Sequence, residues 1–170
     1  MNFRSAAKDD LPQLKTMYKE IISNMNKNNI EIWDDVYPCE FFSEDIENNC
    51  LYVLEENKEI ISAFALCDSS LGENYVEWKS KLDRALYIDR FGVNIRYLKR
   101  GIGRVMLDKA IALTKERGVK YLRLFFVDIN EPAINLYIKS GFEKVNGFYD
   151  ERVDDNIILH EFGFEIDTSV

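Results

Sequence analysis

The hydrophobic residues of the chain follow two spacings, and each spacing predicts a different kind of element. Apolar residues three and four positions apart predict helices over residues 8–25, 102–117 and 130–140, and a shorter helix over 43–48. Acidic residues lie in the first turn of the helix predicted over 8–25, as is typical of a helix start. A glycine directly follows each of the helices predicted over 102–117 and 130–140, as is typical of a helix end. The pattern therefore predicts four helices.

Runs rich in β-branched and aromatic residues predict strands between the helices. They cover residues 2–6, 50–56, 59–68, 85–93, 120–128, 142–149 and 156–164. The second and third runs meet at the polar segment "ENKE", which is typical of a hairpin. Because strands and helices alternate in the second half of the chain, at least part of the sheet is expected to be parallel. The pattern thus predicts an α/β fold of the mixed α+β kind.

Length and composition limit the class of protein. The 170 residues fit a single domain over residues 1–170, which would bury about two thirds of the surface of its unfolded chain. With 46% hydrophobic and 31% charged residues, the composition is that of an ordinary globular protein. The opening "MNFRSAAKDD" lacks the apolar core of a signal peptide, and no run approaches the roughly 18 apolar residues of a membrane span. We therefore expect a cytoplasmic protein without a membrane partner.

The net charge and the cysteines of the sequence limit which binding partners and cross-links are expected. A formal net charge of −8 argues against a nucleic-acid partner, because the protein surface would repel phosphates. The same charge is compatible with a cationic acceptor. Cys39, Cys50 and Cys67 are an odd number without CxxC spacing, so we expect reduced thiols and neither a disulfide framework nor a metal site.

The segment "LKRGIGRVMLDKA" places two glycines between a predicted strand and a predicted helix. Free backbone N–H groups and the positive end of the helix dipole meet at such a junction, and anions bind there. Gly101 and Gly103 would let phosphate oxygens approach the backbone. Lys99, Arg100 and Arg104 add positive charge. A phosphorylated cofactor fits this segment, although a glycine pair is equally typical of turn chemistry alone.

Two common phosphate-binding motifs are absent, and a third pattern matches. The sequence has no GxxxxGK[ST] P-loop, and Met106 occupies the position of the third glycine of a Rossmann fingerprint. From Tyr87 to Val145, and more weakly over nearly the whole chain, the sequence resembles the GNAT superfamily of acyl-CoA-dependent N-acetyltransferases. The family has a pyrophosphate motif [QR]xxGx[GA] and a later helix with NxxAxxLYxxxGF. This chain matches the helix motif with Asn130, Ala133, Leu136, Tyr137, Gly141 and Phe142.

The resemblance implies both a fold and a cofactor site. It implies a central mixed β-sheet of about six to seven strands that splays to admit acetyl-CoA, flanked by about four helices. Backbone amides of the glycine turn would hold the pyrophosphate, and the end of the preceding strand would run beside the pantetheine arm. Leu98 stands where the family has Gln or Arg, which should weaken one side-chain contact and leave the backbone donors in place. The implied cofactor-binding residues are Phe91, Gly92, Val93, Leu98, Lys99, Arg100, Gly101, Ile102, Gly103, Arg104, Asn130, Ala133 and Tyr137.

Acetyl transfer to an amine needs a neutral amine, a donor to the oxyanion and a proton source for the leaving thiolate. The resemblance assigns the proton source to Tyr137 and the oxyanion donor to a backbone N–H near Val93. Asp89, on the strand predicted over residues 85–93, is the expected base, acting directly or through water. The sequence thus offers one residue or group for each requirement.

These residues also have structural interpretations that the sequence leaves open. Tyr137 lies on an apolar helix face and fits a core position equally well. Asn130 suits a helix cap. The Asp89 carboxylate could pair with Arg84 or Arg90.

The stretch "IEIWDDVYPCEFF" breaks the regular pattern with a proline and clustered aromatic residues, which predicts a loop over a cleft. Trp33 and Tyr37 would form an apolar wall for the acceptor, with Asp34 and Asp35 near its ammonium group. Packing of the loop onto the sheet explains the same residues. The single histidine, His160, lies in the last predicted strand and is expected to have a structural role.

The sequence therefore predicts an N-acetyltransferase. It would move an acetyl group from acetyl-CoA to a primary amine of a small molecule or amino-acid derivative, by direct attack in a ternary complex. Three alternatives remain: a non-catalytic acyl-CoA-binding regulatory module, a protein or peptide N-acetyltransferase, and a structural α/β domain with a coincidental glycine turn. A homodimer is left open.

Overall fold

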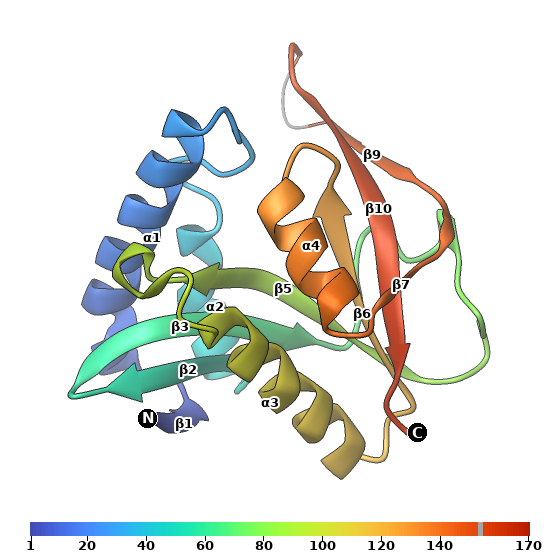
Figure 1. Cartoon of the computed structure of the whole chain (residues 1–170), viewed down its shortest axis with the longest axis horizontal. Helices are drawn as coiled ribbons and strands as arrows, with labels where there is room; N and C mark the ends of the chain where they lie inside the picture. Colours follow the sequence, from blue (N-terminus) through green and yellow to red (C-terminus); the bar gives the residue numbers. More distant parts are fainter. Residues whose placement is uncertain (153–154) are drawn as a thin grey trace. The chain divides into compact units, whose positions relative to one another are not determined.

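The structure, a computed structural model, describes residues 1–152 and 155–170 (Figure 1). Strand β5 (Ala85–Val93) and helix α3 (Ile102–Glu116) each begin in one compact unit and end in another. Within the described ranges, four α-helices accompany a mostly antiparallel sheet, which confirms the predicted mixed α/β fold. None of the helices described there is both long and apolar enough to span a bilayer. The units consist of residues 1–66 with 90–106, and of residues 67–89 with 107–170.

The first unit combines a long N-terminal helix with the strand order β1-β2-β3-β5. Its pairs β1–β2 and β2–β3 are antiparallel, which confirms the predicted hairpin. Helix α1 buries the residues whose spacing predicts it, namely Leu14, Met17, Tyr18, Ile21 and Ile22. The elements of this unit are β1 (Asn2–Ser5), α1 (Leu11–Lys27), α2 (Phe42–Glu47), β2 (Leu51–Glu56) and β3 (Glu59–Cys67).

The second unit has the strand order β5-β6-β10-β7, with β9 also paired to β10. Strand β5 runs parallel to β6 over residues 85–88 and 121–124, which confirms the expected parallel pairing. Strand β10 is antiparallel to β6, β7 and β9. Helix α4 lies against β6 and β10 (Figure 1). The bounds are β6 (Tyr121–Val127), α4 (Glu131–Lys139), β7 (Glu143–Lys144), β9 (Tyr149–Arg152) and β10 (Ile158–Asp167).

The strand predicted over residues 142–149 is wrong as one continuous element. It is divided into β7, β8 (Asn146–Gly147) and the first residue of β9, and β8 pairs with β4 (Val76–Glu77) in a separate two-stranded sheet. Gly147 has φ +90°, and a Cβ added there would lie 2.9 Å from the Tyr75 carbonyl oxygen. The chain therefore turns at this glycine, and a side chain larger than hydrogen does not fit beside Tyr75.

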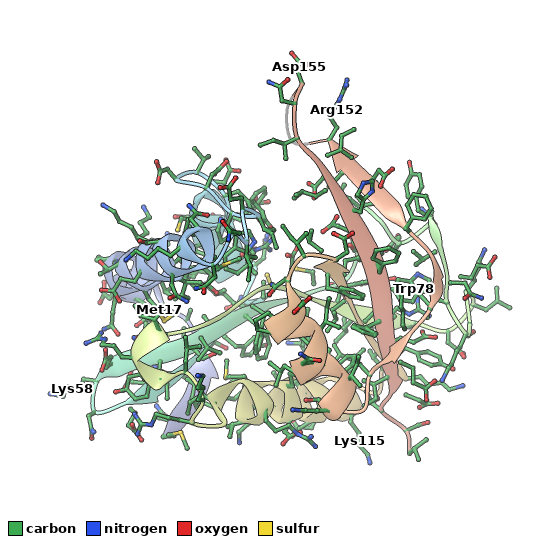
Figure 2. All side chains as sticks on the ribbon, turned by 45° about the horizontal axis from the view of Figure 1, so that its top comes forward. Met17, Lys58, Trp78, Lys115, Arg152 and Asp155 are labelled. Atoms are coloured by element: carbon green, nitrogen blue, oxygen red, sulfur yellow. The ribbon has the colours of Figure 1, made fainter. Side chains whose placement is uncertain are left out.

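The two faces of β6 and β10 have different neighbours. On one face a Cβ added to Gly163 would meet the Trp78 ring at 2.8 Å, so the indole lies directly on β10 (Figure 2). On the other face the rings of Phe126 and Phe164 stack with centroids 4.3 Å apart. Tyr137 of α4 lies 6.1 Å from the Phe164 ring. Helix α4 therefore covers the face opposite Trp78.

Candidate active site

The glycine turn connects the end of β5 to the start of α3. Asn94 begins a single 3₁₀ turn by accepting a hydrogen bond from the Arg96 amide at 3.0 Å. After this turn Lys99 and Gly101 have φ values of +60° and +77°. A Cβ added to Gly101 would meet no atom within 4 Å. The backbone conformation therefore favours glycine at this position, and the space beside it is open to a ligand.

The backbone N–H groups of Ile102 and Gly103 lie in the first turn of α3, where an α-helix has no internal acceptors for such groups. Lys99 and Arg100 are exposed beside these donors, and the Arg100 guanidinium lies 4.7 Å from the centroid of the Tyr97 ring. Amide donors, a helix dipole and cationic side chains at an open glycine fit the phosphates of a CoA molecule.

One of the amides that the sequence assigns to the pyrophosphate already has an acceptor. The Leu98 N–H donates to the Ile95 carbonyl oxygen at 3.4 Å, which closes the 3₁₀ turn. The Leu98 side chain is 46% exposed and lies on the surface of the turn. Because the Leu98 amide is already engaged, the amides from Arg100 onward are the better candidates to bind an anion.

Asn130 caps helix α4, as one of the two interpretations of the sequence predicts. Its Oδ1 accepts a hydrogen bond from the Ala133 amide at 3.4 Å. The cap uses the side-chain oxygen, and the Nδ2 amide group is a donor that a ligand could use.

Tyr137 is buried on α4 between aromatic rings. The centroids of the Phe142 and Phe164 rings lie 6.2 and 6.1 Å from that of Tyr137. Burial and the negative charge of Asp89 raise the pKa of the Tyr137 phenol above its ordinary range. The phenol therefore keeps its proton at neutral pH and is available as a hydrogen-bond donor. Tyr137 is therefore a core residue whose phenol also experiences the charge of the Asp89 carboxylate.

Asp89 lies where the pairing between β5 and β6 ends. The parallel register runs to Ile88 opposite Leu124, and Asp89 is the next residue. It is half-buried. The two arginines that the sequence offers as partners bind other carboxylates: Arg84 lies 3.2 Å from Asp68, and Arg90 lies 2.7 Å from Asp45. The charge of Asp89 acts on groups from two other elements, Tyr137 on α4 and Glu161 on β10.

Glu161 is a candidate that the sequence analysis missed. It lies on β10 opposite Val127 of β6 and Tyr149 of β9. Burial raises the pKa of its carboxyl to about 8, with contributions from the charge of Glu151, a hydrogen bond with Glu151 and the charge of Asp89. In "NIILHEFGF" this glutamate resembles a solvent-facing residue of an edge strand. Glu151 comes near Glu161 because β9 pairs with β10, and the sequence pattern does not show this pairing.

The aromatic loop residues pack within their own unit. The Trp33 ring lies 5.6 Å from the Tyr18 ring, and the Tyr37 ring 5.6 Å from the Phe41 ring. Asp34 accepts hydrogen bonds at 2.8 Å from the amides of Val36 and Tyr37, so this carboxylate stabilises the loop. These contacts are with α1 and with Phe41, whereas the sequence offered packing onto the sheet, and the acceptor role stays a prediction.

His160 is exposed and bonded to Asp150 across the β9–β10 hairpin, which agrees with a structural role. Within residues 1–152 and 155–170, Cys39, Cys50 and Cys67 take part in no disulfide, and the Cys50 thiol donates to the Asp45 carboxylate at 3.6 Å.

Comparison with known proteins finds acetyltransferases by sequence and by structure. The sequence model of the acetyltransferase (GNAT) family matches residues 15–142. YwnH of Bacillus subtilis (strain 168), described as a candidate phosphinothricin acetyltransferase, is 25% identical over 143 residues, which are 84% of this chain and 83% of YwnH.

Solved structures share the fold. A GNAT-family acetyltransferase of Streptococcus agalactiae 2603 superposes with a TM-score of 0.79 and 16% identity over 98% of this chain and 94% of its own. The yncA protein of Salmonella typhimurium, solved with its cofactor acetyl-CoA, gives a TM-score of 0.70 and 18% identity over 98% and 93% of the two chains.

Proposed function

The chain belongs to the acetyltransferase (GNAT) family and uses acetyl-CoA, and on that premise we propose that it is an N-acetyltransferase acting on primary amines. The acceptor is a small molecule or an amino-acid derivative, and the amine attacks the thioester directly in a ternary complex. The protein works in the cytoplasm. Bound acetyl-CoA supplies a thioester carbonyl and a thiolate leaving group.

The glycine turn and the α4 helix hold acetyl-CoA in this proposal. The amides from Arg100 to Arg104 bind the pyrophosphate, with the side chains of Lys99, Arg100 and Arg104 adding charge. Residues 91–93 run beside the pantetheine arm, and the N–H near Val93 donates to the oxyanion. Asn130 Nδ2 and the surface of Ala133 complete the site.

Two carboxyl groups can take the proton of the acceptor ammonium. Asp89 is the proposed base, acting directly or through water. Glu161 is a second acceptor for that proton through its ionised form, which is the minor form at pH 7 and grows as the pH approaches the pKa of about 8. The negative charge of Asp89 favours a cationic acceptor.

Tyr137 donates a hydrogen bond to the departing sulfur in this scheme. Its raised pKa keeps the phenol protonated. The same shift makes the phenol a weak acid relative to a thiol, whose reference pKa is about 8.5. The hydroxyl therefore stabilises the thiolate mainly by hydrogen bonding, with only partial proton transfer.

The observation that carries the proposal is that the negative charge of Asp89 acts on two largely buried groups from other elements, the Tyr137 phenol of α4 and the Glu161 carboxyl of β10. Titratable side chains gathered in this way are typical of a reaction centre. This arrangement favours an enzyme over a non-catalytic acyl-CoA-binding module, which has no need of it.

An amine screen tests the proposal. The protein is incubated with acetyl-CoA and one amine at a time, drawn from phosphinothricin, free amino acids, diamines and peptides with free N-termini, and thiol release is followed. At least one small amine should release thiol well above the rate with acetyl-CoA alone. Release with peptides only would support a protein N-acetyltransferase instead. CoA binding by native mass spectrometry without release on any amine would support the binding module.

A further inference from the structure

Arg90 has a backbone conformation that is uncommon within a strand. Its φ is +53°, in the left-handed region that residues other than glycine rarely adopt. It lies in β5, directly after Asp89. Because such a conformation persists only where the surroundings hold it, the contacts of Arg90 should explain it.

The side chain of Arg90 is held by a buried ion pair. Its Nε and Nη2 each donate to one oxygen of the Asp45 carboxylate, both at 2.7 Å. Arg90 is 8% exposed and Asp45 5%. The guanidinium also lies 5.1 Å from the centroid of the Phe41 ring. Two parallel hydrogen bonds between a planar guanidinium and a carboxylate fix orientation as well as distance.

The backbone at Arg90 and two residues after it is held by two hydroxyl groups. The Tyr18 hydroxyl donates to the Arg90 carbonyl oxygen. The hydroxyl can approach because residue 92 is glycine: a Cβ on Gly92 would lie 2.9 Å from the Tyr18 hydroxyl oxygen. The Ser62 hydroxyl donates to the Gly92 carbonyl oxygen at 2.6 Å. Three side chains from α1, α2 and β3 thus determine the path of β5 through residues 90–92.

We propose that Arg90 is a positioning residue: its ion pair with Asp45 holds β5 in the conformation that presents residues 91–93 to the pantetheine arm of acetyl-CoA. The inference rests on the proposed function, which places that arm beside these residues. Arg90 itself is buried under Phe41 and Asp45 and acts through the backbone that follows it.

The sharpest variant removes both charges together. Asp45→Leu with Arg90→Met replaces the pair by apolar side chains, and such replacements are often neutral or stabilising. Either single change would leave a buried charge without its partner. The variant therefore separates the stability of the fold from the path of β5, and its thermal unfolding midpoint is expected to stay within a few degrees of the parent.

Two ligands report on two parts of the site in isothermal titration. CoA extends over both the glycine turn and residues 91–93, whereas adenosine 3′-phosphate 5′-diphosphate, its nucleotide end, reaches only the glycine turn. The double variant should bind CoA at least tenfold more weakly and the nucleotide as the parent does. Equal affinity for CoA in the folded variant, or equal losses for both ligands, would overturn the inference.

A matched control removes an exposed ion pair of the same unit. Lys8 lies 3.3 Å from Glu47, and Lys8→Met with Glu47→Gln leaves the net charge unchanged. CoA affinity should not change in this control; a loss there equal to that in the double variant would also overturn the inference.

A second variant tests the inference if the double variant does not fold. Arg90→Lys keeps the charge and loses the two-pronged geometry, so CoA affinity should fall several-fold with the nucleotide unaffected, and unchanged CoA affinity would overturn the inference. A parent protein that binds no CoA would overturn the proposed function itself, and this inference with it.

Discussion

Glu161 is a carboxyl group that holds its proton near neutral pH because it is buried beside Glu151 and Asp89. Its folded-state pKa of about 8 lies above the ordinary value of 4.5. The contribution of this group to stability is therefore fully present below about pH 4.5 and is lost as the pH rises through 8. Near neutral pH the group therefore already weakens the fold, and only its minor ionised form can accept a proton.

Glu161→Gln should consequently stabilise the protein at high pH. Glutamine keeps the shape of the protonated side chain and cannot ionise, so the free energy of unfolding should exceed that of the parent by at least about 1 kcal/mol at pH 9. At about pH 4, below the ordinary pKa of 4.5, the two proteins should be nearly equal. Urea unfolding followed by tryptophan fluorescence measures both. Asp155→Asn, on an exposed residue, should show no such pH-dependent gain. A Glu161→Gln variant no more stable than the parent at pH 9 would contradict the raised pKa.

Tyr137→Phe removes one hydroxyl and preserves the packing of α4 against Phe164. If the hydroxyl stabilises the departing thiolate, kcat should fall roughly 10- to 100-fold with CoA affinity almost unchanged. Steady-state kinetics on the amine found in the screen, with titration of CoA, measures both quantities. Tyr75→Phe, at an exposed tyrosine, is the control that should keep the parent rate. A Tyr137→Phe enzyme with the parent kcat, under conditions where chemistry limits turnover, would leave Tyr137 as a core residue only.

At the scale of the element, the glycine turn can be tested against a second glycine with the same conformation. Gly101 and Gly118 have φ values of +77° and +65°, and a Cβ at either would meet nothing within 4 Å. They lie just before the start of α3 and just after its end. Valine at either position is strained by the backbone to a similar degree.

Gly101→Val and Gly118→Val should therefore lose similar amounts of stability and differ in ligand binding. Only the first should obstruct the phosphates and weaken CoA binding by more than tenfold, or about 1.4 kcal/mol. Isothermal titration with CoA on folded variants compares them directly. Equal CoA affinities in the two variants would show that the turn is not the phosphate site.

The aromatic loop, residues 30–38, offers a test of the acceptor side. Trp33→Ala and Tyr37→Ala should raise KM for the amine and leave CoA affinity nearly unchanged, because the loop is proposed to contact the acceptor only. Val36→Ala, an exposed residue of the same loop, is the control that should leave KM unchanged. Equal losses for amine and CoA would assign Trp33 and Tyr37 to loop packing alone, the role that their contacts with Tyr18 and Phe41 already support.

The elements that the sequence predicts well are those decided by their own residues. Helix α1 buries the apolar residues whose spacing predicts it, and the glycine turn lies between β5 and α3 as expected. The strand predicted over residues 142–149 fails because its path depends on distant residues, namely the Tyr75 carbonyl and the pairing of β8 with β4. Glu161 was missed for the same reason, since the shift of its pKa depends on its burial and on the charges of Glu151 and Asp89 from other strands.

At the scale of the whole molecule, the central claim is that this chain catalyses acetyl transfer to nitrogen. The net charge of −8 is compatible with a cationic acceptor, and the cationic side chains of the glycine turn offer a local exception for an anionic cofactor. Both features are equally expected of a binding module. Only the fate of the acetyl group separates the two.

The most direct measurement follows that group. The protein is incubated with acetyl-CoA labelled with ¹³C in the acetyl carbonyl and with the amine panel of the screen, and the products are identified by mass spectrometry and ¹³C NMR. The account predicts that label moves to an amide of at least one small amine, with one CoA thiol released for each amide formed. Label that stays on bound acetyl-CoA with every amine would contradict the account, as would label that appears only in acetate or in an ester.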